Sequence, residues 1–296
     1  MSTPPWLNLS FLVPDRDVEL LEAVLEAAGA LAVSCEAEDD VPIFDQPGSN
    51  EPRLWPRCRI TGLFDAAADR DAVAAAVARA GLECPIFAAD ALADEPWHTR
   101  WMAQFEPVMF GAGLCVCPTW REPLPGARAV VRLDPGMAFG TGTHPTTGLC
   151  LDWLAREGFL AGRRVLDYGC GSGILAIAAL KCGAREVVAV DIDEDALRVT
   201  RENAALNGCP ALRVLHPDAL APGERYDVLV ANLLQNPLLA LREEFRARLV
   251  PGGALGVSGL LEAQAATILA AYTAPFTMDS TQTRGGWAFI AGHLAG

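Results

Sequence analysis

Basic side chains are scarce in this sequence. Its 296 residues include 23 lysine and arginine residues against 37 aspartate and glutamate residues, a net charge of −14. Lys181 is the one lysine. An acidic chain repels the phosphates of nucleic acids and attracts basic proteins, although acidity also serves solubility alone. We therefore expect no direct contact with nucleic acid.

Long apolar runs are also lacking. No run approaches the ~18 residues that a membrane-spanning helix needs. The N-terminal sequence MSTPPWLNLSFLVPD has no basic segment followed by an apolar one, as a secretory signal would. Hydrophobic residues still make up 51% of the chain, which is enough for a core. We expect a cytoplasmic protein of about two domains that does not contact a membrane.

The nine cysteines follow no metal-binding or disulfide pattern. Cys115 and Cys117 form the one close pair, and C-V-C spacing matches neither zinc sites nor thioredoxin-like sites. Most of the others have apolar neighbours. We interpret the cysteines as small buried residues in a reducing compartment and expect no metal site.

The first 90 residues hold most of the excess negative charge, with 16 acidic and 6 basic side chains. Their patterns predict the order β-α-β-β-α-β, which is typical of ferredoxin-like α+β domains. The strands are predicted at residues 6–13, 31–35, 57–64 and 84–89, and the helices at 15–30 and 65–80. No motif for chemistry falls here, so we expect a binding domain at residues 1–90.

Residues 91–107 are predicted to form a linker helix. Trp97 and Trp101 are four residues apart, which places both on one helix face. Residues 108–296 form the other predicted domain, in which β-branched strands alternate with helices from Val165 onward. This alternation indicates a Rossmann-like, doubly wound α/β domain with a parallel sheet covered on both faces.

The sequence VLDYGCGSG begins at Val165 with the first predicted strand of this sheet, which ends at Asp167, and continues into a glycine-rich turn. Glycines at such a turn let a ligand approach the backbone beside a helix N-terminus, as we expect at Gly169 and Gly171. A dinucleotide pyrophosphate needs the longer G-x-G-x-x-G spacing. The shorter spacing therefore disfavours a nicotinamide-dependent oxidoreductase or nucleotide-binding module, and it suits a ligand without phosphates.

Asp191 ends the next predicted strand, in the sequence VVAVDID. An acidic residue at this place accepts hydrogen bonds from the two hydroxyls of a ribose. The alternative role is a helix N-cap, for which Asp193 is the better candidate.

Together, VLDYGCGSG and VVAVDID resemble the class I S-adenosylmethionine-dependent methyltransferases. Two further stretches, LDPGMAFGTGTHPTTGLC from Leu133 and NLLQNPL from Asn232, are similar to a narrower family. This is the PrmA family of bacterial methyltransferases, which modify the stalk-base protein L11 of the large ribosomal subunit. The similarity runs from Trp97 to the C-terminus, and the long string AFGTGTHPTT makes a chance match improbable.

The resemblance implies an enzyme that transfers methyl groups from S-adenosylmethionine to lysine side-chain and N-terminal amines of this basic ribosomal protein. It also implies that the N-terminal domain holds the substrate while a linker lets the catalytic domain present several amines. Three alternatives remain: a methyltransferase of another protein or small amine, the oxidoreductase, and a ribosome-assembly factor without catalysis.

Site residues follow from matching the family motifs. The residues implied to bind the cofactor are Phe139, Thr141, Thr147, Gly169, Gly171, Asp191 and Asn232. Asn232 would orient the cofactor or the incoming amine, or else cap a turn. Thr147 would bind the cofactor or N-cap a helix, and Phe139 is either a loop contact or a core anchor.

No residue is predicted as a general base. We expect His144 to be a loop residue held by Pro145. Methyl transfer from a sulfonium depends on the alignment of the reacting atoms more than on a base. Asn236 stands where the family usually has glycine before Pro237. Because asparagine tolerates positive φ better than other non-glycine residues, we expect the turn there to survive.

Overall fold

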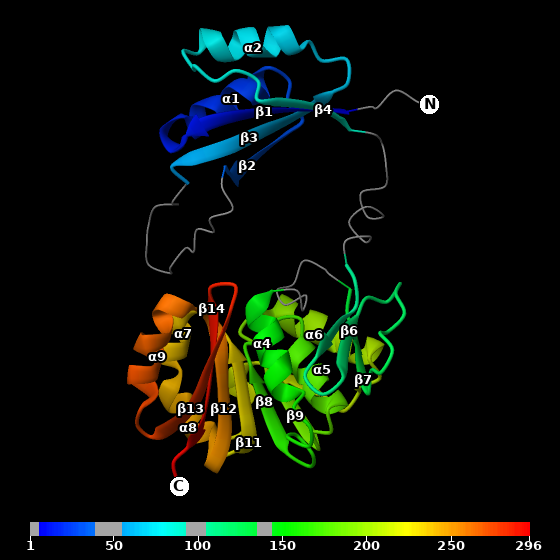
Figure 1. The fold of residues 1–296 in the computed structure, drawn as a ribbon, viewed down its shortest axis with the longest axis vertical. Helices are drawn as coiled ribbons and strands as arrows, with labels where there is room; N and C mark the ends of the chain where they lie inside the picture. Colours follow the sequence, from blue (N-terminus) through cyan, green and yellow to red (C-terminus); the bar gives the residue numbers. More distant parts are fainter. Residues whose placement is uncertain (1–5, 39–54, 93–104, 135–143) are drawn as a thin grey trace. The chain divides into compact units, whose positions relative to one another are not determined.

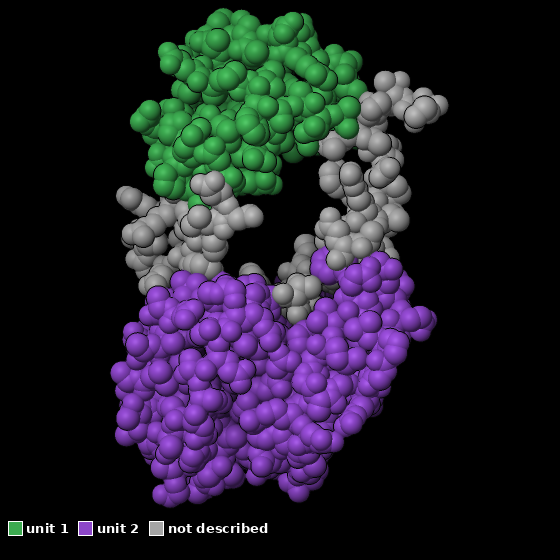
Figure 2. Space-filling view, viewed as in Figure 1, with its two compact units in different colours: residues 1–104 green, residues 105–296 purple. Residues whose placement is uncertain are grey.

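The computed structural model describes residues 6–38, 55–92, 105–134 and 144–296 (Figure 1). The chain divides into two units, residues 1–104 and residues 105–296, which are coloured separately in Figure 2. Most of the predicted linker helix, with Trp97 and Trp101, lies outside the described residues. Phe139 and Thr141 lie outside them as well.

The first unit is an antiparallel sheet with two helices, α1 and α2, on one face (Figure 1). The strand order is β2-β3-β1-β4, which confirms the ferredoxin-like prediction. Its elements are β1 (Trp6–Pro14), α1 (Val18–Ala27), β2 (Ala32–Ala37), β3 (Arg57–Asp65), α2 (Arg70–Arg79) and β4 (Ala88–Leu92). The last strand begins four residues later than expected.

Alternate residues of these strands face the helices and form the core of the first unit. Phe11 of β1 and Ile60 of β3 are fully buried, together with Leu21 and Leu25 of α1. The opposite side of α1 carries charge, because Glu19 and Glu26 are exposed there.

The second unit is built on a seven-stranded sheet with the order β10-β9-β8-β11-β12-β14-β13. The strands β10, β9, β8, β11 and β12 are parallel, whereas β14 is antiparallel to both β12 and β13. The strands are β8 (Arg164–Tyr168), β9 (Glu186–Val190), β10 (Arg213–Leu215), β11 (Tyr226–Asn232), β12 (Leu249–Leu261), β13 (Phe276–Arg284) and β14 (Trp287–Leu294).

Helices cover both faces of this sheet, which confirms the doubly wound prediction (Figure 1). One core contains α4 (Pro145–Leu154), α5 (Ile174–Lys181) and α6 (Glu194–Leu206), and the other α7 (Gln235–Ala240), α8 (Arg242–Arg248) and α9 (Ala265–Tyr272). Neighbouring strand residues divide between the cores: Val165 belongs to the first and Leu166 to the second. None of the helices in the described part of the chain is long and apolar enough to cross a bilayer.

Two strands at the C-terminus were not predicted, and they make the sheet mixed rather than parallel. β13 and β14 pair so that Arg284 lies opposite Trp287, which leaves Gly285 and Gly286 as a two-residue hairpin turn. Both glycines have positive φ, 56° and 79°. A Gly-Gly pair is a recognised signal for such a hairpin, but the exposed polar sequence of β13 lacks the alternation expected of a strand.

The expectation for Asn236 is wrong. No non-glycine residue in the described segments has positive φ. Asn236 lies in the first turn of α7, which begins at Gln235. This position does not require glycine, because the backbone is helical there. Two short helices follow β11, α7 (Gln235–Ala240) and α8 (Arg242–Arg248).

A small three-stranded sheet precedes α4 in the chain. It consists of β5 (Val108–Phe110), β6 (Leu114–Cys117) and β7 (Ala129–Arg132).

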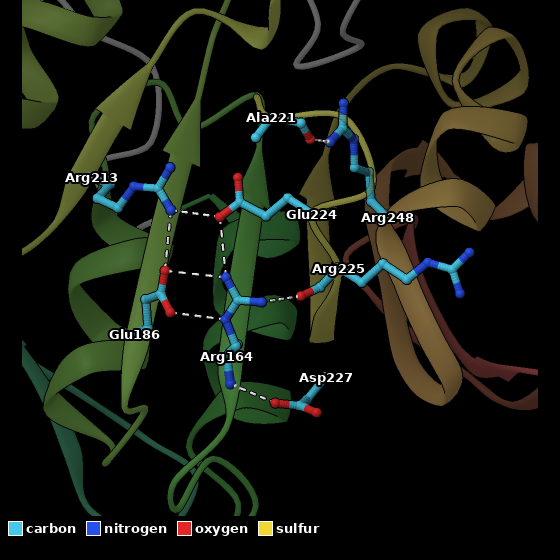
Figure 3. A network of polar contacts seen from close by, with 8 residues as sticks. All are labelled: Arg164, Glu186, Arg213, Ala221, Glu224, Arg225, Asp227 and Arg248. Atoms are coloured by element: carbon cyan, nitrogen blue, oxygen red, sulfur yellow. Dashed lines mark hydrogen bonds and ion pairs between the residues drawn. The ribbon is translucent and has the colours of Figure 1, made fainter. Parts of the chain in front are cut away.

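Ion pairs connect the amino ends of the large sheet's strands. Arg164 Nε lies 2.8 Å from Glu186 Oε2, and Arg213 Nη1 lies 2.6 Å from Glu224 Oε1 (Figure 3). These contacts join neighbouring strands and leave their carboxyl ends to the candidate site.

Candidate functional site

The glycine turn, residues 169–173, joins the carboxyl end of β8 to α5. Gly169, Gly171 and Gly173 have φ angles of 80°, 53° and 78°. This left-handed region favours glycine. A Cβ atom at Gly169 would also collide with the side chain of Leu233, which follows β11. The turn therefore needs its glycines for both conformation and close packing. The predicted approach of a ligand to the backbone of Gly169 and Gly171 stays a prediction.

Asp191 lies beside this turn and holds it. The backbone N–H of Gly171 donates to Asp191 Oδ2 at 2.9 Å, and the N–H of Asp193 donates to Asp191 Oδ1 at 3.1 Å. Each carboxylate oxygen retains a second lone pair. Asp193 is the N-cap of α6 and accepts from the N–H of Asp195, which confirms that part of the prediction. Asp191 is thus placed at the strand end where a ribose would be bound, and its role there stays a prediction.

Asp167 is a buried carboxyl beneath the turn to which the sequence assigned no role. Its side chain is fully buried, and Oδ2 accepts from the N–H of Ala176 at 3.0 Å. Oδ1 has no hydrogen-bond partner among the described residues. Burial, with a smaller contribution from the nearby Asp191 charge, raises the pKa of this carboxyl to about 7. A positive charge near Oδ1 would be stabilised, because it would offset both effects.

Asn232 and Thr147, predicted separately, are in contact. Asn232 Nδ2 donates to Thr147 Oγ1 at 3.2 Å, and Thr147 is buried in the first turn of α4. The N-cap of α4 is His144, whose ring nitrogen accepts from the N–H of Thr146, so the alternative role of Thr147 as a cap is wrong. Asn232 Oδ1 is buried and has no partner among the residues the structure describes. Because the Thr147 contact fixes the amide, this oxygen has a fixed direction in which it can accept a hydrogen bond from a ligand.

The backbone after Asn232 is hydrogen-bonded to β12, a contact that the sequence did not predict. The N–H of Leu233 donates to the carbonyl of Ser258 at 2.9 Å. Gly259, which follows Ser258 in β12, has a φ of 90°, and a Cβ atom there would collide with the Leu233 carbonyl. Strand pairing with β14 shifts register between Ser258 and Leu260, as in a β-bulge. A glycine inside a strand pattern was the signal for it.

The hairpin of β13 and β14 packs against the start of α4. The ring of Trp287 meets the ring of His144 edge-on, with centroids 4.6 Å apart. Arg284 Nη2 contacts Asp152 Oδ2 at 2.6 Å. Burial lowers the pKa of His144, so its ring is neutral near pH 7. Its Nδ1 is engaged with Thr146, which agrees with the view that His144 is a structural residue.

These groups suit a ligand that is positively charged and carries vicinal hydroxyls. The carboxyl ends of neighbouring strands β9, β8 and β11 place Asp191, the glycine turn and Asn232 along one edge of the sheet. Two buried acceptor atoms, Asp167 Oδ1 and Asn232 Oδ1, have no partner within the described segments. S-adenosylmethionine fits this set, since it has a sulfonium, an ammonium and a ribose.

Comparisons with known proteins agree on one family. The family model described as "Ribosomal protein L11 methyltransferase (PrmA)" matches residues 5–294. The chain is 44% identical over 286 residues to the ribosomal protein L11 methyltransferase of Cellvibrio japonicus, covering 96% of each chain. It is also 44% identical over 291 residues to that of Pseudomonas aeruginosa (strain LESB58), covering 97% of this chain and 98% of the relative.

A solved structure supports the same assignment. The crystal structure of a ribosomal protein L11 methylase from Lactobacillus delbrueckii subsp. bulgaricus matches with a TM-score of 0.59 and 33% identity. The match covers 65% of this chain and all of the other. The chain therefore belongs to the ribosomal protein L11 methyltransferase (PrmA) family.

Proposed function

We propose that this protein transfers methyl groups from S-adenosylmethionine to lysine side-chain and N-terminal amines of ribosomal protein L11. The observation that carries the proposal is that similarity to L11 methyltransferases spans 96% of the chain. It therefore includes the first unit, where no motif for chemistry occurs. A methyltransferase of small amines would have no need of that unit.

The cofactor is held along the edge formed by β9, β8 and β11. Gly169 and Gly171 let the methionine part approach the backbone, and Asp191 accepts the ribose hydroxyls. Phe139 and Thr141 complete the cofactor contacts in this proposal. When bound, S-adenosylmethionine would supply a methyl carbon on a positively charged sulfur: a neutral amine would bond to this carbon as the carbon–sulfur bond breaks, and S-adenosylhomocysteine would leave.

Asn232 orients the amine. Its Oδ1 accepts an N–H of the incoming nitrogen, which aims the nitrogen lone pair at the methyl carbon. Thr147 fixes which way the amide points, because Oγ1 accepts from Asn232 Nδ2 at 3.2 Å. The substrate amine loses its proton to water before transfer, and a site poor in water lowers the pKa of that amine.

The first unit attracts the substrate by charge. In this proposal residues 1–90 recognise the substrate, residues 91–107 join the two domains, and residues 108–296 catalyse the methyl transfer. The protein acts in the cytoplasm. The outer side of α1 and its preceding turn bear the exposed carboxylates of Asp15, Glu19 and Glu26. Opposite charges on two partners speed their encounter and orient it, and ribosomal proteins are usually basic.

The test is transfer of radiolabelled methyl groups from S-adenosylmethionine to purified L11. We expect label in L11, and none in Asp191→Ala reactions. Polylysine serves as a second acceptor without the fold of L11. Equal labelling of polylysine and L11 would refute substrate recognition by the first unit, and no labelling of L11 would refute the proposed substrate.

A further inference from the structure

Helix α6 has polar side chains where it faces the interior. Thr200 and Asn203 of the helix and its C-cap residue, Asn207, are spaced i, i+3 and i+7, which places them on one side of the helix. Thr200 is completely buried and Asn207 is 6% exposed. A helix usually presents apolar residues on its buried side. The α6 polar stripe, as we call these three residues, therefore needs partners to offset the cost of burial.

Two residues of the α6 polar stripe hold the glycine turn. Thr200 Oγ1 donates to the carbonyl oxygen of Gly171 at 2.9 Å, and Asn203 Nδ2 donates to the carbonyl oxygen of Ser172 at 2.8 Å. The N–H of Gly171 already donates to Asp191. Both polar backbone groups of Gly171 are thus bound by side chains from the neighbouring β9–α6 segment.

Packing and a second hydrogen bond reinforce this contact. A Cβ atom at Gly173 would lie 2.7 Å from Thr200 Cγ2, so the threonine methyl group packs against the last glycine of the turn. Cys170 Sγ lies 3.4 Å from Thr200 Oγ1. Because the threonine hydrogen is used by Gly171, the thiol is the donor there.

The third residue of the stripe anchors α6 elsewhere. The side-chain amide of Asn207 accepts from the N–H of Arg132 at 2.6 Å and donates to the Arg132 carbonyl at 2.7 Å. It therefore pairs with the edge of β7 as a neighbouring strand would. This fixes the helix from which Thr200 and Asn203 reach the turn.

From these contacts we infer that Thr200 and Asn203 are positioning residues for the cofactor. They hold the carbonyls of a glycine-rich turn whose backbone has many alternative conformations, and keep it in the one conformation that receives S-adenosylmethionine. The inference rests on the proposed function only in that the bound molecule is S-adenosylmethionine; it does not depend on which amine is methylated.

Calorimetric titration with S-adenosylhomocysteine, the demethylated product, tests this role without turnover. Thr200→Val keeps the shape and the methyl contact but removes the hydroxyl. We expect its Kd to rise roughly threefold to tenfold, the effect of one net hydrogen bond. Thr200→Ser keeps the hydroxyl and should stay within about twofold of the wild type on the same scale. Asn203→Leu, at a half-buried position, should weaken binding as Thr200→Val does.

The matched control is Thr61→Val, the same change at a hydroxyl that contacts Ser10 Oγ at 2.8 Å within the first unit. The Kd of Thr61→Val for S-adenosylhomocysteine should equal that of the wild type. In turnover, Thr200→Val should raise KM for S-adenosylmethionine and leave KM for the protein substrate unchanged. A structural role alone would lower the unfolding temperature of Thr200→Val and Asn203→Leu with unchanged Kd, and that result would overturn the inference.

The same titration separates this inference from the proposed substrate. Wild-type binding of S-adenosylhomocysteine without methylation of L11 would refute the substrate, and the variants would still show the predicted loss. A wild-type protein that does not bind S-adenosylhomocysteine would overturn both.

Discussion

The buried carboxyl of Asp167 should make the stability of the second unit depend on pH. The pKa of this group is raised from 3.8 to about 7 by burial. Below about pH 4 the carboxyl is protonated in both states. Between pH 4 and 7 the folded protein keeps the proton that the unfolded chain releases, so the free energy of unfolding falls as pH rises. Above pH 7 this contribution is constant.

The magnitude follows from the size of the shift. Three pKa units at about 1.4 kcal/mol each give roughly 4 kcal/mol lost between pH 4 and pH 7. Asp167→Asn keeps an oxygen that can accept from Ala176 and removes the charge. The unpaired amide hydrogens of the asparagine cost about 1–3 kcal/mol, independently of pH. The quantity that tests the reasoning is therefore the difference in the free energy of unfolding between the two proteins, and how steeply this difference changes with pH.

The assay is urea unfolding of the wild type and Asp167→Asn at pH 5, 6, 7 and 8, using the transition that S-adenosylhomocysteine shifts. We expect the variant to gain about 1.4 kcal/mol per pH unit relative to the wild type from pH 5 to 7. The gain should level off above pH 7. Parallel curves for the two proteins would show that the Asp167 carboxyl is ionised in the folded state, and would refute the reasoning.

Three further predictions concern the site and its support. Thr147→Val should lower kcat/KM about tenfold because the Asn232 amide loses its fixed orientation, whereas equal activity in Thr147→Val and Thr147→Ser would contradict this role. Gly259→Ala should abolish most activity, since its Cβ displaces Leu233, while Gly252→Ala, also at positive φ but with open space around it, should retain activity in the same assay. Arg164→Met should lower the free energy of unfolding by about 2 kcal/mol by leaving Glu186 partly unpaired, with an unchanged Kd for S-adenosylhomocysteine; a weaker Kd would show that the ion pairs also affect the site.

Much of the fold could be predicted because strong local signals agree with it. The helix α6 begins with the capping residue Asp193 and ends before Gly208, as the sequence indicates. Residues 187–190 of β9 form a continuous apolar run, which is typical of a parallel sheet covered on both faces. β13 lacked such a signal, because seven of its nine residues are exposed and few are apolar.

The site could be predicted in part for a similar reason. Parallel strands end at one edge of a sheet, so Asp191 and Asn232 were expected at the same edge as the glycine turn. The contacts of Thr200, Asp167 and Gly259 depend on segments distant in the chain: Thr200 and Gly171, for example, are 29 residues apart. Composition and spacing give no sign of which buried polar atoms stay without a partner, and these atoms define the expected ligand.

Tandem mass spectrometry of L11 after incubation with this protein and S-adenosylmethionine tests the central claim most directly. The account predicts mass gains in steps of one methyl group, located on lysine side chains and the N-terminal amine. The gains should disappear with Asn232→Ala, although that variant still folds. Unmodified L11, or methyl groups on residues other than amines, would contradict it.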